Sequence, residues 1–272
     1  MKITVLIENT GSEPLKSEHG LSFFIAFHSK QYLLDAGQSG AFMDNAKLLG
    51  VDLDHIDMTI LSHGHYDHAD GFVRYLDTYP DRKIYGQPAI FEPYYSGSKD
   101  RMHYIGLNEK LLAVKDRFIV ADEMMQIDDH VYLIRDPGSE TAGKKLYRKE
   151  GDTYVHDDFH HEQSLVFDTE KGLVVFNSCS HTGLISIVEN IEKRMHKPVY
   201  AYIGGLHMKS VKHGVEGTDF TKEELKAIAD FALSHIQYVY TGHCTGNVAM
   251  EILKRYMQER LLALYTGCVI EL

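Results

Sequence analysis

The stretch "LSHGHYDHADG", residues 61–71, places three histidines and an aspartate within six positions: His63, His65, Asp67 and His68. It follows residues 56–61, a hydrophobic run that predicts a short buried strand. Side chains two apart at a strand end can point to the same side, and Gly64 and the following turn let the last two fold back. Imidazole suits zinc, iron, copper and nickel, and a carboxylate widens the choice towards manganese and iron. The pattern predicts a metal site.

Three further histidines follow predicted strands, in the segments "VVFNSCSHTG", "VYAYIGGLHM" and "VYTGHCTG": His181, His207 and His243. We expect them to converge with the first group at one edge of the sheets, where layered α/β folds place their sites. A lone histidine after a strand is a ligand in roughly one case in ten, but the dense motif raises that weight here. Eight others are interpreted as structural or solvent-facing: His19, His28, His55, His103, His130, His196, His213 and His235.

The order of the predicted elements favours an α/β fold. Runs of β-branched and aromatic residues predict strands, strand–helix alternation follows them, and this order appears twice. It predicts an αββα sandwich of two mixed β-sheets with helices on the outer faces, in a single domain over residues 1–272. Thr221 and Glu224 have the spacing of a capping box that opens a helix. Residues 87–117 and 137–162 show no sustained period and predict loop-rich insertions.

Composition excludes several classes of protein. The 272 residues are 44% hydrophobic and 25% charged, as in ordinary globular proteins. A formal net charge of −11 argues against a nucleic-acid partner. No apolar stretch approaches the roughly 18 residues of a membrane span, and the N-terminal segment turns polar at Glu8, too early for a signal peptide. Three cysteines fit a reducing compartment. We therefore expect a cytoplasmic protein that acts on a small molecule, and its oligomeric state stays open.

The H-x-H-x-D-H pattern after a strand resembles the central metal motif of the metallo-β-lactamase superfamily. "YLLDAGQSG" resembles the early strand-Asp-Gly motif of that family, and "TGHCTG" resembles its final histidine motif. "SCSHTG" and "IGGLH" are similar to the subgroup of dihydropteroate-synthase-like and ribofuranosylaminobenzene 5'-phosphate synthase-like proteins. The resemblance covers most of the chain and implies two adjacent divalent metals in the αββα fold.

By this resemblance, one metal would be held by His63, His65 and His181, and the other by Asp67, His68 and His243. Asp35 would orient the ligands through hydrogen bonds, as buried carboxylates commonly do around metal-bound histidines. Zinc is the expected metal, with iron or manganese as alternatives.

The sequence departs from the family pattern in two places. Ser139-Glu140 stands where many relatives carry a ligand histidine, and "SCSH" replaces the strand-ending Gly-Asp whose carboxylate bridges the metals. His181 is therefore an alternative occupant of the bridging position. The residues that can compensate are Glu140, Asp157, Asp158, His160 and His161, although an exposed polar loop is the interpretation we favour. Cys179 and Cys244 are either soft ligands or small residues packed under the site.

The reaction that fits these residues is hydrolysis by a metal-bound hydroxide, because a metal lowers the pKa of bound water from about 15.7 towards 7. Asp67 and His207 are the predicted catalytic residues: His207 would donate a proton to the leaving group, and its alternative role is that of a further ligand. Thr245, Gly246 and Asn247 would form a helix N-terminus that binds an anion, which favours a small phosphoester substrate.

Two other functions compete with hydrolysis. A di-iron redox protein on the same fold would favour glutamate in place of His65 and would need a flavin domain. A non-catalytic metal-binding or sensor protein would not need all four residues of the central motif. We also expect the insertion at 87–117 to overhang the site and shape substrate access; packing of its aromatics as a small separate core is about equally favoured.

Overall fold

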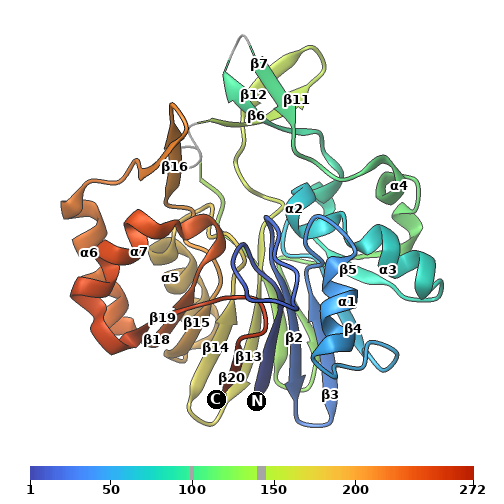
Figure 1. Ribbon diagram of the computed structural model, residues 1–272, viewed down its shortest axis with the longest axis horizontal. Coiled ribbons are helices and arrows are strands. Elements are labelled where there is room, and N and C mark those ends of the chain that lie inside the picture. Colours follow the sequence, from blue (N-terminus) through green and yellow to red (C-terminus); the bar gives the residue numbers. More distant parts are fainter. Residues whose placement is uncertain (99–100, 140–144) are drawn as a thin grey trace. The chain divides into compact units, whose positions relative to one another are not determined.

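The computed structural model describes residues 1–98, 101–139 and 145–272, which divide into two compact units. The first unit comprises Met1–Asp122, Ser139–Gln163 and Tyr265–Leu272. The second comprises Glu123–Gly138 and Ser164–Leu264. Each contains a seven-stranded mixed sheet (Figure 1). Glu140, one of the candidate compensating residues, lies outside the described residues.

The sheet of the first unit has the order β20-β1-β2-β3-β4-β5-β8. Its strands are β1 (Lys2–Ile7), β2 (Ser22–Phe27), β3 (Lys30–Leu34), β4 (Met58–Ile60), β5 (Ile84–Gly86), β8 (Phe118–Val120) and β20 (Val269–Glu271). The strands from β3 to β8 are parallel, and the others pair antiparallel. Parallel strands need crossovers, and these are provided by α1 (Ala41–Leu48), α2 (Tyr66–Ala69), α3 (Phe72–Thr78), η1 (Pro88–Phe91), α4 (Glu109–Leu112) and η2 (Lys115–Arg117).

The core of this unit forms where helices bury their apolar sides against the sheet. Phe42 of α1 and Phe72 and Tyr75 of α3 pack in one cluster with Leu6 of β1 and Leu33 of β3. All five side chains are fully buried, so the hydrophobic effect holds these helices on this face of the sheet.

The regions predicted to be loop-rich insertions contain strands. β6 (Tyr94–Ser98), β7 (Arg101–Tyr104), β11 (Leu146–Glu150) and β12 (Thr153–His156) form a separate sheet of order β12-β11-β6-β7. Within the first unit this sheet lies at the end away from both chain termini (Figure 1). Its strands are mostly half-buried or exposed. β6 pairs with the next strand β7, and β11 with the next strand β12, whereas β6 and β11 pair across about 50 residues, with Tyr147 opposite Tyr95. The local alternation of polar and apolar residues does not predict pairing between strands that lie so far apart in the chain.

The sheet of the second unit has the order β19-β18-β15-β14-β13-β10-β9. Its strands are β9 (Met124–Asp128), β10 (Val131–Arg135), β13 (Gln163–Thr169), β14 (Gly172–Phe176), β15 (Val199–Ile203), β18 (Ile236–Thr241) and β19 (Leu261–Ala263). β14, β15, β18 and β19 are parallel, so their carboxyl ends share one edge of the sheet. A hairpin of β16 (Lys209–Lys212) and β17 (Val215–Thr218) follows β15.

Helices α5 (Leu184–Met195), α6 (Lys222–His235) and α7 (Asn247–Met257) cover one face of this sheet (Figure 1), and short 3₁₀ turns η3 (His243–Thr245) and η4 (Gln258–Arg260) flank α7. The predicted capping box is confirmed, because Thr221 and Glu224 satisfy each other's backbone amides at the start of α6. The predicted α/β class with two mixed sheets and helices is likewise confirmed. No helix in the described part of the chain has the length and apolar character of a membrane span.

Candidate metal centre

The central histidine motif is folded into one compact, buried group in the first unit. The ring of His63 lies 4.6 Å from that of His65 and 4.3 Å from that of His68, between centroids. Asp67 Oδ2 lies 3.6 Å from His68 Nε2. The short helix α2 begins one residue after His65, so a single turn returns Asp67 and His68 towards the strand end. All four are at most 7% exposed.

A single carboxylate, that of Asp35, organises two of these histidines. Asp35 directly follows β3 and is fully buried. Its Oδ2 accepts a hydrogen bond from His68 Nδ1 at 2.8 Å and another from Ser62 Oγ at 2.7 Å, while its Oδ1 accepts from the Ser62 amide at 2.7 Å. Because the Ser62 hydroxyl donates to Asp35, its oxygen accepts from His63 Nδ1, 2.8 Å away. When neutral, the rings of His63 and His68 therefore carry their protons on Nδ1 and their lone pairs on Nε2.

This donor set fits a divalent metal. Metal-bound histidines commonly donate their other ring N–H to a carboxylate or similar acceptor, which is the role that Asp35 and Ser62 have here. Burial, together with the nearby His161 and against the opposing charge of Asp67, lowers the pKa of His65 to about 3. His65 is thus a neutral imidazole near neutral pH, the protonation state that a ligand needs.

The other histidines set aside by the sequence are on the surface. All eight that were interpreted as structural or solvent-facing are exposed. One of them, His19, places Nε2 at 3.3 Å from Asp67 Oδ2 and so contacts the motif from solvent.

Two residues of the 137–162 region are buried against the motif, contrary to the exposed polar loop that we favoured. Asp157 and His161 are 1% and 0% exposed. His161 Nε2 lies 3.0 Å from Asp157 Oδ2, and its Nδ1 accepts a hydrogen bond from the Gly64 amide at 3.0 Å. Their neighbours Asp158 and His160 are more exposed and form a separate pair. Buried polar residues need partners, and in "DDFHH" Asp157 pairs with His161 while Asp158 pairs with His160. The grouping of two aspartates and two histidines was therefore a signal in the sequence for this arrangement.

The second unit gathers its own group of histidines and cysteines at the carboxyl ends of β14, β15 and β18. The rings of His181 and His207 lie 4.2 Å apart between centroids. Cys179 Sγ lies within 4.8 Å of a ring nitrogen of His181 and of one of His243, and 3.5 Å from Cys244 Sγ. Burial would raise the pKa of the Cys244 thiol, but its contacts with Cys179 and His207 lower it well below its ordinary value. These are imidazole and thiol donors, which suit zinc.

The two glycines before His207 serve the packing of neighbouring turns. A Cβ on Gly204 would lie 1.8 Å from the carbonyl oxygen of Asn177, and one on Gly205 would lie 2.4 Å from Cys244 Sγ. The His207 amide also donates to Cys244 Sγ at 3.3 Å. In the structure, the backbone that approaches these glycines belongs to the turn after β14.

The predicted anion site at the start of α7 is filled by the protein itself. The Asn247 amide donates to the carboxylate of Glu216 from β17. Thr245 Oγ1 accepts from the Leu206 amide at 2.9 Å, and a Cβ on Gly246 would meet Lys209 Cβ at 2.9 Å. Burial would raise the pKa of Glu216, but the Asn247 amide and the Lys209 ammonium outweigh it and lower the pKa. The anion that stabilises this helix end is therefore a side chain, which the sequence spacing did not reveal.

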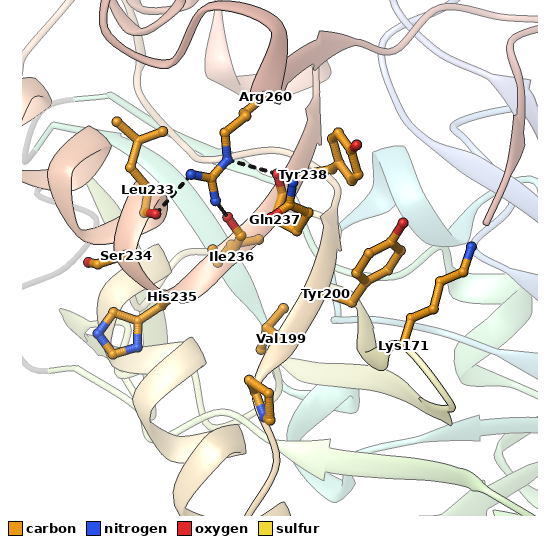
Figure 2. Close-up of a pocket in the computed structure, with 11 residues that line it drawn as sticks. Lys171, Val199, Tyr200, Leu233, Ser234, His235, Ile236, Gln237, Tyr238 and Arg260 are labelled. Carbon is orange, nitrogen blue, oxygen red and sulfur yellow. Dashed lines mark hydrogen bonds between the residues drawn. The ribbon is translucent and has the colours of Figure 1, made fainter.

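A cavity of about 520 Å³ lies elsewhere in the second unit, at the opposite ends of β15 and β18. Figure 2 shows that the Arg260 guanidinium there donates to the carbonyl oxygens of Leu233, Ile236 and Gln237. Lys171 lies over the ring of Tyr200. Both cations thus have partners within the protein, and none of the predicted site residues lines this cavity.

Comparison with known proteins identifies the family. The model of the metallo-β-lactamase superfamily matches residues 17–201. A 7,8-dihydropterin-6-methyl-4-(β-D-ribofuranosyl)-aminobenzene-5'-phosphate synthase from Methanocaldococcus jannaschii is 30% identical over all of this chain and 96% of its own.

Among solved structures, a metal-dependent hydrolase of the β-lactamase superfamily is 27% identical, with a TM-score of 0.83 over 100% of this chain and 99% of the other. Zinc-bound PqqB from Methylobacterium extorquens is 11% identical, with a TM-score of 0.61 over the whole of both chains, and shares the fold.

Proposed function

The chain belongs to the metallo-β-lactamase superfamily, and on that premise we propose that it is a metal-dependent hydrolase of small anionic phosphoesters. The observation that carries the proposal is the hydrogen-bonded group around Asp35, which orients two buried histidines through Nδ1, so that Nε2 is the nitrogen that would bind a metal. A solvated or purely structural histidine cluster would not need its tautomers fixed by one carboxylate.

In this proposal the ligands of two divalent metals, zinc in the first place, are His63, His65, Asp67, His68, His181 and His243. When bound, such metals polarise a substrate oxygen and lower the pKa of water. Asp35 and Ser62 keep the ligand rings in the correct tautomer and orientation. His207 donates the proton that the leaving group takes up, since its ring lies beside that of His181 and is partly exposed.

Hydrolysis is supported by the relative of known structure that is described as a metal-dependent hydrolase and is similar along the whole chain. A phosphorylated substrate is supported by the name of the Methanocaldococcus relative, which specifies a 5'-phosphate. The helix N-terminus at Asn247 no longer supports it, because Glu216 already occupies that position.

The Methanocaldococcus relative also favours a second candidate function, that of a synthase. Its name describes a product in which a dihydropterin methyl group is joined to a ribofuranosyl-aminobenzene phosphate. The new bond to the methyl carbon would replace that carbon's bond to a leaving group such as a diphosphate. A metal site of this kind would then stabilise the negative charge of the leaving group in place of activating water.

The experiment that separates these functions starts with protein purified without chelator and analysed for metals. Purified enzyme is then incubated with a panel of phosphomonoesters, phosphodiesters, lactones and thioesters. A separate incubation contains ribofuranosyl-aminobenzene phosphate and a dihydropterin whose 6-methyl carbon carries a diphosphate leaving group. Release of phosphate or alcohol that stops on chelation and returns with zinc supports the hydrolase. Hydrolysis of lactones or thioesters alone would contradict the proposed phosphoester substrate but would still support a hydrolase. Product formation only with the paired substrates would favour the synthase.

A further inference from the structure

A buried Asp–His pair outside the predicted ligand set contacts the backbone of the histidine motif. His161 Nδ1 accepts the hydrogen bond of the Gly64 amide, the peptide between His63 and His65. Its Nε2 donates to Asp157 Oδ2 at 3.0 Å, and Asp157 Oδ1 accepts from the Phe159 amide at 2.9 Å. Both carboxylate oxygens and both ring nitrogens therefore have defined hydrogen-bond directions.

The ring of His161 is also enclosed by aromatic side chains of the first unit. It lies 4.0 Å from the ring of Tyr94 and 5.2 Å from that of His65, between centroids. The Tyr94 hydroxyl donates to the carbonyl oxygen of Ala89 at 2.7 Å, which fixes the tyrosine in turn. Gly64 itself has no room for a side chain, since a Cβ there would lie 2.7 Å from the Ile90 carbonyl oxygen and 3.1 Å from the Tyr94 ring.

We propose that Asp157 and His161 are positioning residues that hold the peptide of Gly64 and thereby set the spacing of His63 and His65 for metal binding. This inference rests on the proposed metal-dependent function. Asp157 holds the proton of His161 on Nε2, so that Nδ1 keeps the lone pair that the Gly64 amide requires. Without that acceptor, a buried amide would lose its partner and the loop would shift to find another.

A direct ligand role for His161 is the competing interpretation, because ring or carboxylate atoms of His65, Asp157 and His161 lie within 4.8 Å of one another. However, a ring nitrogen that accepts from Gly64 and another that donates to Asp157 leave no lone pair on His161 for a metal. The two roles predict different effects of asparagine at position 161. Its side-chain oxygen can take the place of Nδ1 as the acceptor from Gly64, but the amide is a poor zinc ligand.

The test measures metal affinity of the full-length protein by competition with a chromophoric chelator, and the visible spectrum of the cobalt-substituted protein. His161→Ala should weaken metal binding roughly 10- to 100-fold and alter the cobalt bands, as loss of an orienting hydrogen bond typically does. His161→Asn should recover most of that loss, and Asp157→Ala should fall between the two. The matched control is the neighbouring exposed pair, for which Asp158→Ala and His160→Ala should leave affinity and spectrum unchanged.

The outcomes separate this inference from the proposed function. Wild-type protein that binds no metal would overturn both. Wild-type protein that binds metal while His161→Ala binds it equally tightly, with an unchanged cobalt spectrum, would overturn the positioning role alone. Loss of a full equivalent of metal in both His161→Ala and His161→Asn would make His161 a ligand and overturn it as well. If His161→Ala fails to fold, His161→Asn and Asp157→Ala are each compared with wild type. Near-normal metal binding in His161→Asn together with weakened binding in Asp157→Ala supports the positioning role.

Discussion

The Asp35→Asn substitution tests the tautomer argument most directly. Asparagine has nearly the shape of aspartate and tolerates the left-handed backbone of position 35, where φ is 58°. It replaces one acceptor oxygen by an NH₂ group, although Asp35 accepts three hydrogen bonds from Ser62 and His68. With the amide oxygen on the Ser62 amide, the NH₂ group faces His68 Nδ1. His68 then relieves the clash by moving its own proton to Nε2, which removes the lone pair that would bind metal.

The magnitude follows from the bonds that are lost. A hydrogen bond to a charged group contributes about 1.5–3 kcal/mol. Because about 1.4 kcal/mol corresponds to a tenfold change in a dissociation constant, the metal affinity should fall roughly 10- to 100-fold. Chelator competition measures this loss, and ¹⁵N-edited NMR of the apo protein reports which nitrogen of His68 carries the proton. The matched control is Asp70→Asn, a motif-neighbouring carboxylate that accepts from the Asn108 amide.

Unchanged metal affinity in Asp35→Asn, with His68 still protonated on Nδ1, would refute the reasoning that Asp35 sets the ligand tautomer. An equal loss of affinity in Asp70→Asn would also refute it, because the effect would then arise from the local charge and not from the hydrogen bond.

Three other substitutions have defined outcomes. His207→Ala should lower turnover about 100- to 10,000-fold with metal content unchanged, as loss of a general acid does, and the loss should be smaller for substrates with better leaving groups. Steady-state kinetics and elemental analysis check this, and loss of a metal would make His207 a ligand. Gly205→Ala should destabilise the protein by about 1–3 kcal/mol in urea unfolding, because its Cβ would lie 2.8 Å from the rigid Ser178 carbonyl oxygen. Glu216→Gln should lower the free energy of unfolding by about 0.5–1 kcal/mol near pH 7. Since the folded-state pKa of Glu216 is lowered, its contribution is complete above its ordinary pKa of 4.5 and disappears as the pH falls through the lowered value, so the two proteins should converge in acid.

The parts of the fold that the sequence predicted are those encoded by local patterns. The capping box at Thr221 is confirmed, and every run predicted as a strand forms a strand of one of the two seven-stranded sheets. The edge strands β9 and β20 of these sheets were not predicted. The dense histidine motif was readable because its members share one strand end and one turn. The strands β6, β7, β11 and β12 were missed because most of their residues are half-buried or exposed and show no sustained alternation. The pairing of β6 with β11, which joins the four strands into one sheet, also spans about 50 residues of chain.

The hairpin of β16 and β17 was missed although its signal is local. His213 and Gly214 both have positive φ, at 52° and 78°, as a two-residue hairpin turn requires, and "KHGV" is compatible with that turn. The consequence is functional, because β17 carries Glu216 to the start of α7. Without the hairpin, the helix N-terminus looked open to a substrate anion. The local sequence suggested a site for a substrate anion, but the carboxylate of Glu216, from an earlier part of the chain, takes that position.

The strand ends around the two histidine groups share one further property. Asp35, Ser180, His207 and His243 each have a φ near 50–60°, in the left-handed region that residues other than glycine rarely adopt. Such conformations cost roughly 1–3 kcal/mol each and persist only where the surroundings enforce them. Around Asp35 the enforcing contacts are its three accepted hydrogen bonds, and around Ser180 they are bonds to Asn177 and Gly205. Backbone strain that is held in place by buried polar contacts is characteristic of sites whose side chains must be aimed, and this is what a metal site requires of its ligands.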